Sequence, residues 1–366
     1  MAKKKSKNVV ICLDGTGNQF NEDNSNVVKL FRVLRREAGA QVAYYDPGVG
    51  TLADPGYKSS VAKKINMGLG LAFGRGLTRN VEEAYSYLMD HYEEGDRIYL
   101  FGFSRGAFTA RALAGFIQHC GLLEKGCQNL IPYALRLFKS KKVDFPLAAR
   151  FKQTYARTCP IHFVGLWDTV STYGWVYDPI YLPFTTNNKG VKAARHALAI
   201  DEKRVFFRPS LLGEFGDKKE VWFAGVHSDV GGGYPESESG LAKIPLQWMV
   251  EEARDRFDLL IDDERYQQYV FGNKRREYVA PDPLGPQHES LKGPWWVAEL
   301  FPIRRRIWEG GVEKREWHMP RPSSRRAIKE GSTIHSSVLD RMAAGGYSPP
   351  NLPDPGEIRS RFEIEA

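Results

Sequence analysis

Short apolar runs alternate along the chain with longer stretches in which apolar residues recur every three or four positions. The apolar runs have the length of strands and are rich in β-branched and aromatic residues. They lie at 9–13, 42–45, 97–103, 161–167 and 221–226. The stretches with helical spacing lie at 27–36, 77–92, 105–119 and 244–257. Runs that are apolar throughout are typical of parallel strands buried on both faces, so the pattern predicts an α/β fold, a mostly parallel sheet covered by helices.

Three segments interrupt this alternation. They are a Gly-rich segment at 51–76, a basic segment at 126–152 and a polar segment rich in Pro and Trp at 260–331. An α/β chain of 366 residues often closes around one sheet, so we expect these segments to be insertions that form a cap. The sequence thus predicts a basic tail at 1–8, one domain at 9–344 and an extended tail at 345–366, where Pro-rich sequence favours polyproline geometry.

Composition is that of an ordinary soluble globular protein, with 42% hydrophobic and 26% charged residues. We find neither a signal peptide nor an apolar run long enough to span a membrane, which predicts a cytoplasmic protein whose membrane contacts are peripheral and whose secretion, if any, is independent of a signal. The four cysteines form no C-x-x-C pair, so neither a zinc site nor a disulfide framework is expected. A net charge of +8 favours anionic partners without choosing among lipid surfaces, nucleic acid and acidic substrates.

The sequence Gly-Phe-Ser-Arg-Gly at 102–106 stands between an apolar run and a stretch with helical spacing. This context is what a nucleophile elbow requires. Gly102 and Gly106 lack Cβ atoms, so the strand and the following helix can approach each other while Ser104 adopts a strained backbone conformation. Ser104 is therefore the predicted nucleophile, and the alternative interpretation is a simple turn.

The backbone around two loops could stabilise an oxyanion. Ser104 precedes a predicted helix, so the Arg105 N–H is one expected donor. The loop Asp14-Gly-Thr-Gly after the first predicted strand contains small residues that allow close approach, and we expect Gly15 and Thr16 to complete the hole, with Asp14 in support. A tight turn or a phosphate-binding loop are the alternatives, although the Gly-Lys-Ser/Thr ending of a P-loop is absent.

A serine hydroxyl needs a base, and in α/β-hydrolases the acid and then the histidine follow the serine along the chain. Asp168 ends a predicted strand, at the edge where open α/β sheets keep their sites. His227 follows another predicted strand and precedes three glycines, which makes it the best candidate among eight histidines. The alternative for Asp168 is a helix cap, whereas Asp229 is a rival acid that we expect to fix its own loop by local hydrogen bonds.

Several blocks of the sequence together resemble the α/β-hydrolase family of type VI secretion phospholipase effectors and their stand-alone bacterial relatives, long catalogued as a domain of unknown function. The blocks are Leu-Asp-Gly-Thr-Gly-Asn at 13–18, the serine motif with its flanks at 95–108, Leu-Trp-Asp-Thr-Val at 166–170, Ala-Arg-His-Ala-Leu-Ala-Ile-Asp-Glu at 194–202, His-Ser-Asp-Val-Gly-Gly-Gly-Tyr at 227–234 and Ile-His-Ser-Ser-Val at 334–338.

The resemblance implies a triad of Ser104, Asp168 and His227 and hydrolysis of carboxylic esters without a cofactor, with phospholipid as the substrate of known effectors. It leaves toxin and housekeeping roles open. The remaining marks of the family are expected to be structural: His335 as a polar anchor, and a paired ion network under the site. The network would comprise Arg195, His196, Asp201, Glu202 and Arg204.

Two other functions compete with a serine hydrolase. A metal-dependent phosphohydrolase could gather aspartates that follow or end strand-like segments around Mg²⁺, namely Asp14, Asp46, Asp168 and Asp229. A non-catalytic binding module could instead use the basic surface to recruit nucleic acid, but no nucleic-acid motif is present and no nucleic acid is expected.

The segment at 294–308 has three tryptophans and three consecutive arginines. Tryptophan favours the headgroup boundary and arginine favours anionic phosphate, so this segment could lie on a membrane without crossing it. The alternative is that the tryptophans pack the cap onto the sheet. Burial of Trp295 and its neighbours distinguishes the two interpretations.

Overall fold

The computed structural model describes residues 6–15, 24–48, 71–140, 144–170, 174–175, 178–179, 182–273, 277–293, 295–296, 299, 303–309, 312–318 and 325–366. For 71–75, 174–175, 178–179, 303–309 and 312–318 the description covers the backbone alone. Thr16, most of the Gly-rich segment at 51–76 and Pro294 lie outside the described residues.

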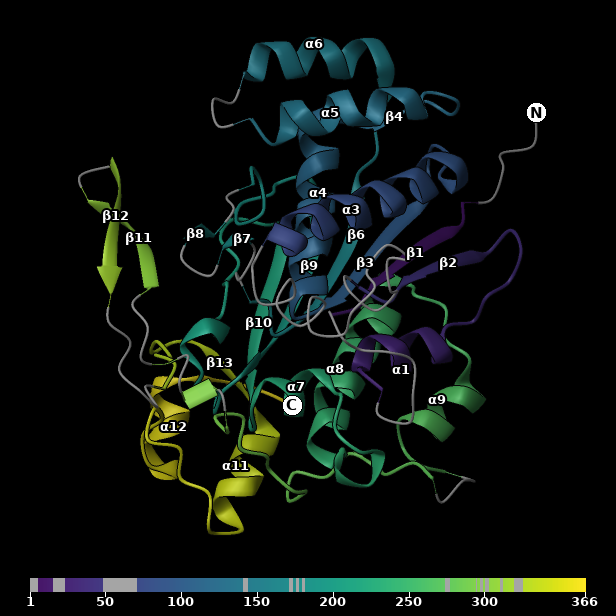
Figure 1. Cartoon of the computed structure of the whole chain (residues 1–366). Coiled ribbons are helices and arrows are strands. Elements are labelled where there is room, and N and C mark those ends of the chain that lie inside the picture. Colours follow the sequence, from purple (N-terminus) through teal and green to yellow (C-terminus); the bar gives the residue numbers. More distant parts are fainter. Residues whose placement is uncertain are drawn as a thin grey trace, which may run out of the picture.

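A sheet of eight strands runs through the middle of the molecule (Figure 1). Its strands are β1 (Asn8–Leu13), β2 (Gln41–Asp46), β3 (Arg97–Phe103), β6 (Ile161–Trp167), β9 (Val191–Ala199), β10 (Asp217–Phe223), β13 (Thr333–His335) and β14 (Glu363–Glu365). They lie in the order β14-β13-β10-β9-β6-β3-β1-β2, and every neighbouring pair is parallel. The carboxyl ends of β3, β6 and β9 therefore meet at one edge of the sheet.

Helices cover both faces of this sheet. Successive side chains of β1 point to opposite faces of the sheet. Val9 and Ile11 pack into one apolar cluster, and Val10 and Cys12 pack into another. The first cluster contains residues of α3 (Leu71–His91), α4 (Arg105–Cys120), α5 (Ile131–Phe138) and α6 (Phe145–Tyr155). The second contains residues of α1 (Asn26–Val33), α8 (Gly240–Phe257) and α9 (Asp263–Tyr269). The predicted fold class, a mostly parallel sheet between helices, is confirmed.

A third apolar cluster closes the far end of the sheet. It joins Leu198 and Trp222 of the sheet to α11 (Ser336–Ala343) and α12 (Pro355–Arg361). The prediction of an extended tail at 345–366 is wrong over its second half, because α12 begins at Pro355 and β14 adds a strand to the sheet. Proline suits the first turn of a helix, and buried Ile358 and Phe362 hold this segment against the core.

Several elements were not predicted. The strand β9 was missed because Arg195 and His196 lie within it. These two residues interrupt the apolar run that is typical of a buried strand. The basic segment at 126–152 contains α5 and α6, and the late segment contains an antiparallel hairpin of β11 (Ile303–Glu309) and β12 (Val312–His318). The α3 helix begins at Leu71, inside the segment predicted as an insertion.

The remaining elements are short. They are β4 (Leu122–Leu123) paired with β5 (Ala156–Arg157), β7 (Gly174–Trp175) paired with β8 (Asp178–Pro179), the 3-10 turns η1 (Gln128–Leu130), η2 (Val205–Phe207) and η3 (Glu236–Glu238), and the helix α7 (His227–Gly231). Two of these, η2 and α7, border the candidate active site. His335, at the end of β13, accepts a hydrogen bond from the Ser337 N–H at 3.3 Å and so caps α11, which confirms its expected structural role.

Candidate active site

Ser104 occupies a sharp turn between β3 and α4. Its backbone lies at φ 58° and ψ −119°, in the left-handed region that L-residues rarely adopt. Two glycines make the turn possible: a Cβ on Gly102 would lie 2.5 Å from the carbonyl oxygen of Gly106, and a Cβ on Gly106 would lie 2.1 Å from that of Leu13. The strained conformation predicted for Ser104 is confirmed.

Asp168 stands beside Ser104 at the same edge of the sheet. It follows the last residue of β6, and the Ser104 N–H donates to the carbonyl oxygen of Trp167 at 3.0 Å. Asp168 has φ 39°, also in the left-handed region, and its side chain is fully buried. The strand β9 holds it in this position: the Asp168 N–H donates to Ala197, and its Oδ1 accepts from the Ala199 N–H at 3.0 Å.

Arg326 binds both oxygens of the Asp168 carboxylate. Nη1 lies 2.5 Å from Oδ1, and Nη2 lies 3.0 Å from Oδ2. Burial alone would raise the pKa of this carboxyl, but the Arg326 guanidinium and the His227 ring together hold the pKa well below its usual value. Asp168 is therefore ionised at neutral pH, although it is out of contact with water.

His227 completes the group. It is the first residue of α7 rather than part of an open loop, and its Nδ1 lies 2.5 Å from Asp168 Oδ2. Because a carboxylate can only accept, Nδ1 carries the proton and Nε2 remains as the basic nitrogen. Phe103, the residue before Ser104, packs its ring on the imidazole at a centroid distance of 4.6 Å.

The protonation state of His227 is set by two opposing effects. Burial disfavours the charged imidazolium and lowers the pKa of His227, while the hydrogen bond and charge of Asp168 act in the opposite direction. The net shift is downward, so the ring is neutral at pH 7. Its backbone is fixed as well, because the His227 N–H donates to Glu202 Oε2 at 3.2 Å.

The loop after β1 lies against the serine turn, through the contact between Leu13 and Gly106. In this structure the Gly15 N–H donates to its neighbour Asp14 Oδ1 at 2.7 Å, and Asp14 Oδ2 accepts from Tyr45 at 3.0 Å. The Gly15 N–H is thus engaged with Asp14. The role of this loop in an oxyanion hole stays a prediction, as does that of the Arg105 N–H at the start of α4.

Asp229 fixes its own loop, as expected. Its Oδ2 accepts from the Val226 N–H at 2.9 Å, and its Oδ1 lies 2.6 Å from Nδ1 of His288. His288 also stacks on Tyr234 and contacts Glu238.

The four aspartates of the metal hypothesis bind different partners. Asp14 accepts from Tyr45, Asp46 accepts from Asn80, Asp168 faces Arg326, and Asp229 faces His288. Within the described part of the chain, no group of three or more His, Cys, Asp or Glu side chains is arranged to hold a metal ion.

The charged residues at 195–204 do not form one network. Only Glu202 and Arg204 pair with each other, at 2.8 Å. Arg195 and His196 are neighbours on a strand and therefore point to opposite faces, where they meet Glu252 and Glu220. The expectation of buried, paired charges is confirmed, but the expectation of a single network is wrong.

Trp295 borders the site. Phe207 of η2 packs edge-on against His227 at 4.9 Å and against Trp295 at 5.2 Å, and Arg204 lies over both Phe207 and Trp295. Trp295 remains 36% exposed and Trp296 48% exposed. Trp295 thus packs onto the site and still presents part of its surface to solvent. Trp308 belongs to β11, whose side chains lie outside the described residues.

The sequence did not reveal Arg326 or Phe207 as site residues. Arg326 lies 158 residues after Asp168, in a segment predicted to be an insertion, and no short-range pattern links the two. Phe207 follows a charged segment without periodicity. Glu202, which accepts from the His227 N–H, lies in the block at 194–202 that resembles the family. That resemblance was the signal that could have identified Glu202 as a site residue.

No helix among the described residues is both long and apolar enough to cross a membrane.

Among solved structures, an uncharacterized protein from Pseudomonas aeruginosa is 19% identical with a TM-score of 0.42, over 70% of this chain and 47% of that one. The Tle1 effector bound to the VgrG spike of the type 6 secretion system is 21% identical with a TM-score of 0.40, over 66% and 53%. An esterase from Thermogutta terrifontis is 13% identical with a TM-score of 0.33, over 70% and 84%.

Sequence comparison gives a firmer relationship. The uncharacterized protein YEL023C of Saccharomyces cerevisiae is 35% identical over 220 residues, which are 55% of this chain and 32% of the yeast protein. The chain thus spans about a third of that relative's length. A family model described as the catalytic domain of Tle1-like phospholipase effectors of type VI secretion matches residues 7–252. The chain therefore belongs to the Tle1-like family of phospholipase effector catalytic domains.

Proposed function

We propose that this protein is a serine hydrolase that cleaves carboxylic esters of lipids through Ser104, His227 and Asp168. The observation that carries the proposal is the 2.5 Å contact between His227 Nδ1 and buried Asp168, beside a serine in a strained turn. The family described as phospholipase effectors supports an ester of a lipid as the substrate class. A carboxylate that orients a neutral imidazole is the arrangement that activates a serine hydroxyl.

The first half of the reaction forms an acyl-enzyme. Ser104 Oγ attacks the ester carbonyl carbon while His227 Nε2 takes the hydroxyl proton. The tetrahedral oxyanion is held by the Arg105 N–H at the start of α4 and by a second donor from the loop after β1. As the carbonyl re-forms, the bond to the leaving alcohol breaks, and His227 returns its proton to that alcohol.

The second half releases the acid. Water attacks the acyl carbon while His227 takes a proton from it, and the bond to Ser104 breaks with return of that proton to Oγ. Asp168 stays ionised throughout, because Arg326 and His227 lower its pKa. Its negative charge stabilises the imidazolium that forms in each half-reaction.

We extend the proposal to peripheral contact with a lipid surface through Trp295 and Trp296. Both indoles are partly exposed, and Trp295 is anchored to the site through Phe207. The bond from the Val205 N–H to Glu299 Oε1, at 2.7 Å, fastens this segment to η2. Exposed indoles held on the rim of a lipid-hydrolysing site suit the headgroup boundary of a bilayer. A cytoplasmic location stays an expectation from the sequence.

A fluorophosphonate probe tests the nucleophile, because it reacts covalently with an activated serine. Mapping of the adduct on the purified protein should place it on Ser104, and Ser104→Ala should abolish labelling. The control is Ser360→Ala, which removes an exposed serine of α12 and should label like the parent. Labelling of another residue, or ester turnover that survives Ser104→Ala and is abolished by a chelator, would favour the metal-dependent alternative.

A further inference from the structure

A second buried histidine lies directly under the catalytic acid. His196 of β9 is fully buried, and its Nε2 accepts a hydrogen bond from the Thr169 N–H at 3.1 Å. Its Nδ1 lies 2.9 Å from Glu220 Oε1, and the two residues are register partners on β9 and β10. The contacts thus run from Glu220 through His196 to the peptide that follows Asp168.

The direction of each hydrogen bond follows from the chemistry of the partners. A backbone N–H can only donate, so Nε2 of His196 carries no proton, and Nδ1 must carry it. Nδ1 then donates to the Glu220 carboxylate, which selects this tautomer of the ring. Without Glu220, the other tautomer would place an N–H against the Thr169 N–H.

The backbone at this point needs such support. Asp168 has φ 39°, which is unfavourable for a residue with a Cβ and persists only where the surroundings impose it. Around this residue, β9 supplies a carbonyl to the Asp168 N–H, an N–H to its carboxylate and the His196 ring to the next peptide. Thr169 is fully buried, so its N–H would have no access to water if the histidine were lost.

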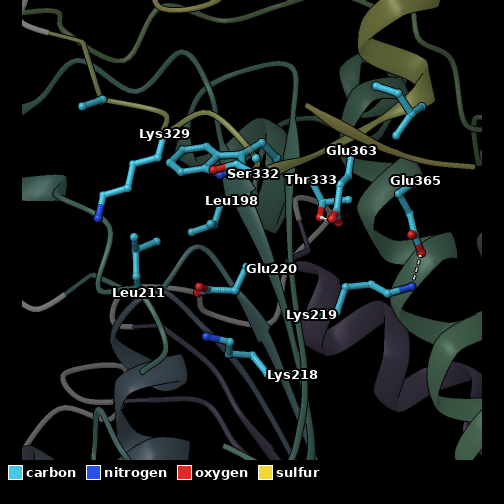
Figure 2. A pocket seen from close by; sticks show the side chains of 14 residues that line it. Leu198, Leu211, Lys218, Lys219, Glu220, Lys329, Ser332, Thr333, Glu363 and Glu365 are labelled. Atoms are coloured by element: carbon cyan, nitrogen blue, oxygen red, sulfur yellow. Dashed lines mark hydrogen bonds and ion pairs between the residues drawn. The ribbon is translucent and has the colours of Figure 1, made fainter. Parts of the chain in front are cut away.

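Of the three residues in this series of hydrogen bonds, Glu220 lies nearest to solvent. Its carboxylate lies on the wall of a groove of about 400 Å³ over β10 and β13, with Leu198 and Lys218 nearby (Figure 2). Burial would raise the pKa of Glu220, but the hydrogen bonds from His196 and from the Leu212 N–H keep it below its usual value. Oε1 also accepts from the Leu212 N–H at 2.9 Å.

We propose that His196 and Glu220 are positioning residues for the catalytic acid: Glu220 fixes the His196 tautomer, and His196 fixes the peptide that holds Asp168 against His227. The proposal rests on the proposed hydrolase function. It gives the family block at 194–202 a role in catalysis through the Thr169 peptide, to which His196 is hydrogen-bonded, and through Glu220, to which His196 is also bonded.

Four variants test this proposal. Glu220→Ala removes the acceptor that selects the tautomer, whereas Glu220→Gln keeps an amide oxygen able to accept from His196. His196→Ala removes the acceptor of the Thr169 N–H. The matched control is His162→Ala, which removes a half-buried histidine at the opposite end of β6, beside Tyr99 and Phe257.

Turnover of a soluble ester is measured with the active fraction determined by titration, so that unfolded protein does not count. We expect His196→Ala and Glu220→Ala to lower kcat roughly 10- to 100-fold with little change in KM, because a small displacement of a supporting group misaligns the reacting atoms. Glu220→Gln and His162→Ala should retain most of the parent kcat.

A second readout does not depend on turnover. The proton shared by His227 and Asp168 should give a far-downfield NMR signal, which Glu220→Ala should shift or broaden and Glu220→Gln should retain. The proposal is overturned if Glu220→Ala and soluble His196→Ala keep both the parent kcat and this signal. Failure of the hydrolase function itself would look different, since the parent would then show no turnover that depends on Ser104.

Discussion

Arg326 and Asp168 are joined at two points, although 158 residues separate them. The guanidinium reaches the carboxylate from the segment that leads into β13, while Asp168 stands at the end of β6. A two-point contact between planar groups fixes orientation as well as distance. Arg326 therefore sets the direction in which the carboxylate faces His227.

The first prediction concerns this pair. Arg326→Gln should leave Asp168 buried with much of its charge uncompensated, which typically costs about 3–5 kcal/mol. We expect a lower free energy of unfolding in urea and a kcat reduced roughly 10- to 100-fold, as for other residues that orient a catalytic group. Arg325→Gln is the matched control, because the neighbouring Arg325 pairs with Asp201 and is more exposed. Equal stability of the two variants would contradict the role given to Arg326.

The second prediction concerns pH. The reaction needs neutral His227, whose pKa is lowered by burial. Activity should therefore be full above this pKa and be lost as the pH falls through it, at a pH below the ordinary histidine value of about 6.5. The measurement is kcat/KM against pH on an uncharged ester. The control is His119→Gln, which replaces a buried histidine in the last turn of α4. An acid limb centred above pH 7 would contradict the burial argument.

The serine turn and the strands β3 and β6 were predictable because their signals are local. The bounds of β3 and β6 agree with the predicted ones. The two glycines that permit the Ser104 turn stand only two positions from it in the sequence. The contact between His227 and Asp168 could be anticipated from the order of residues in the fold. A carboxylate at a strand end and a histidine after a later strand are patterns that a single sequence carries.

The supporting contacts were not predictable in this way. Arg326, Glu220 and Phe207 reach the site through long-range packing, which leaves no periodic pattern. The strand β14 was missed for a related reason: a strand of three residues gains its stability from its neighbour β13 rather than from its own sequence.

The third prediction tests the loop after β1. Gly15→Val should displace this loop, because a β-branched side chain restricts the backbone at a position that now has no Cβ. If the loop supplies an oxyanion donor, kcat should fall by about 10² to 10³. Gly356→Val is the control, since a Cβ there meets no atom within 4 Å. Unchanged kcat in stably folded Gly15→Val would exclude the loop from the hole.

The fourth prediction tests the lipid surface. Trp296→Ala and the triple replacement of Arg304, Arg305 and Arg306 by Gln should each weaken binding to anionic phospholipid vesicles while sparing turnover of a soluble ester. Co-sedimentation at low and moderate salt is the measurement. Phe145→Ala removes an exposed aromatic side chain from α6 and should bind vesicles like the parent. Parent-like binding by both test variants would mean that this segment does not contact lipid.

The most direct test of the account is turnover of a simple ester by Ser104→Ala. The serine, the histidine and the aspartate act as one unit, so we expect kcat to fall by about 10⁴ to 10⁶, with no further loss when His227→Ala is added. The protein should remain folded, because the change removes one oxygen from a residue whose turn is imposed by Gly102 and Gly106. Retention of more than a few per cent of the parent kcat by pure Ser104→Ala would contradict the assignment of the nucleophile.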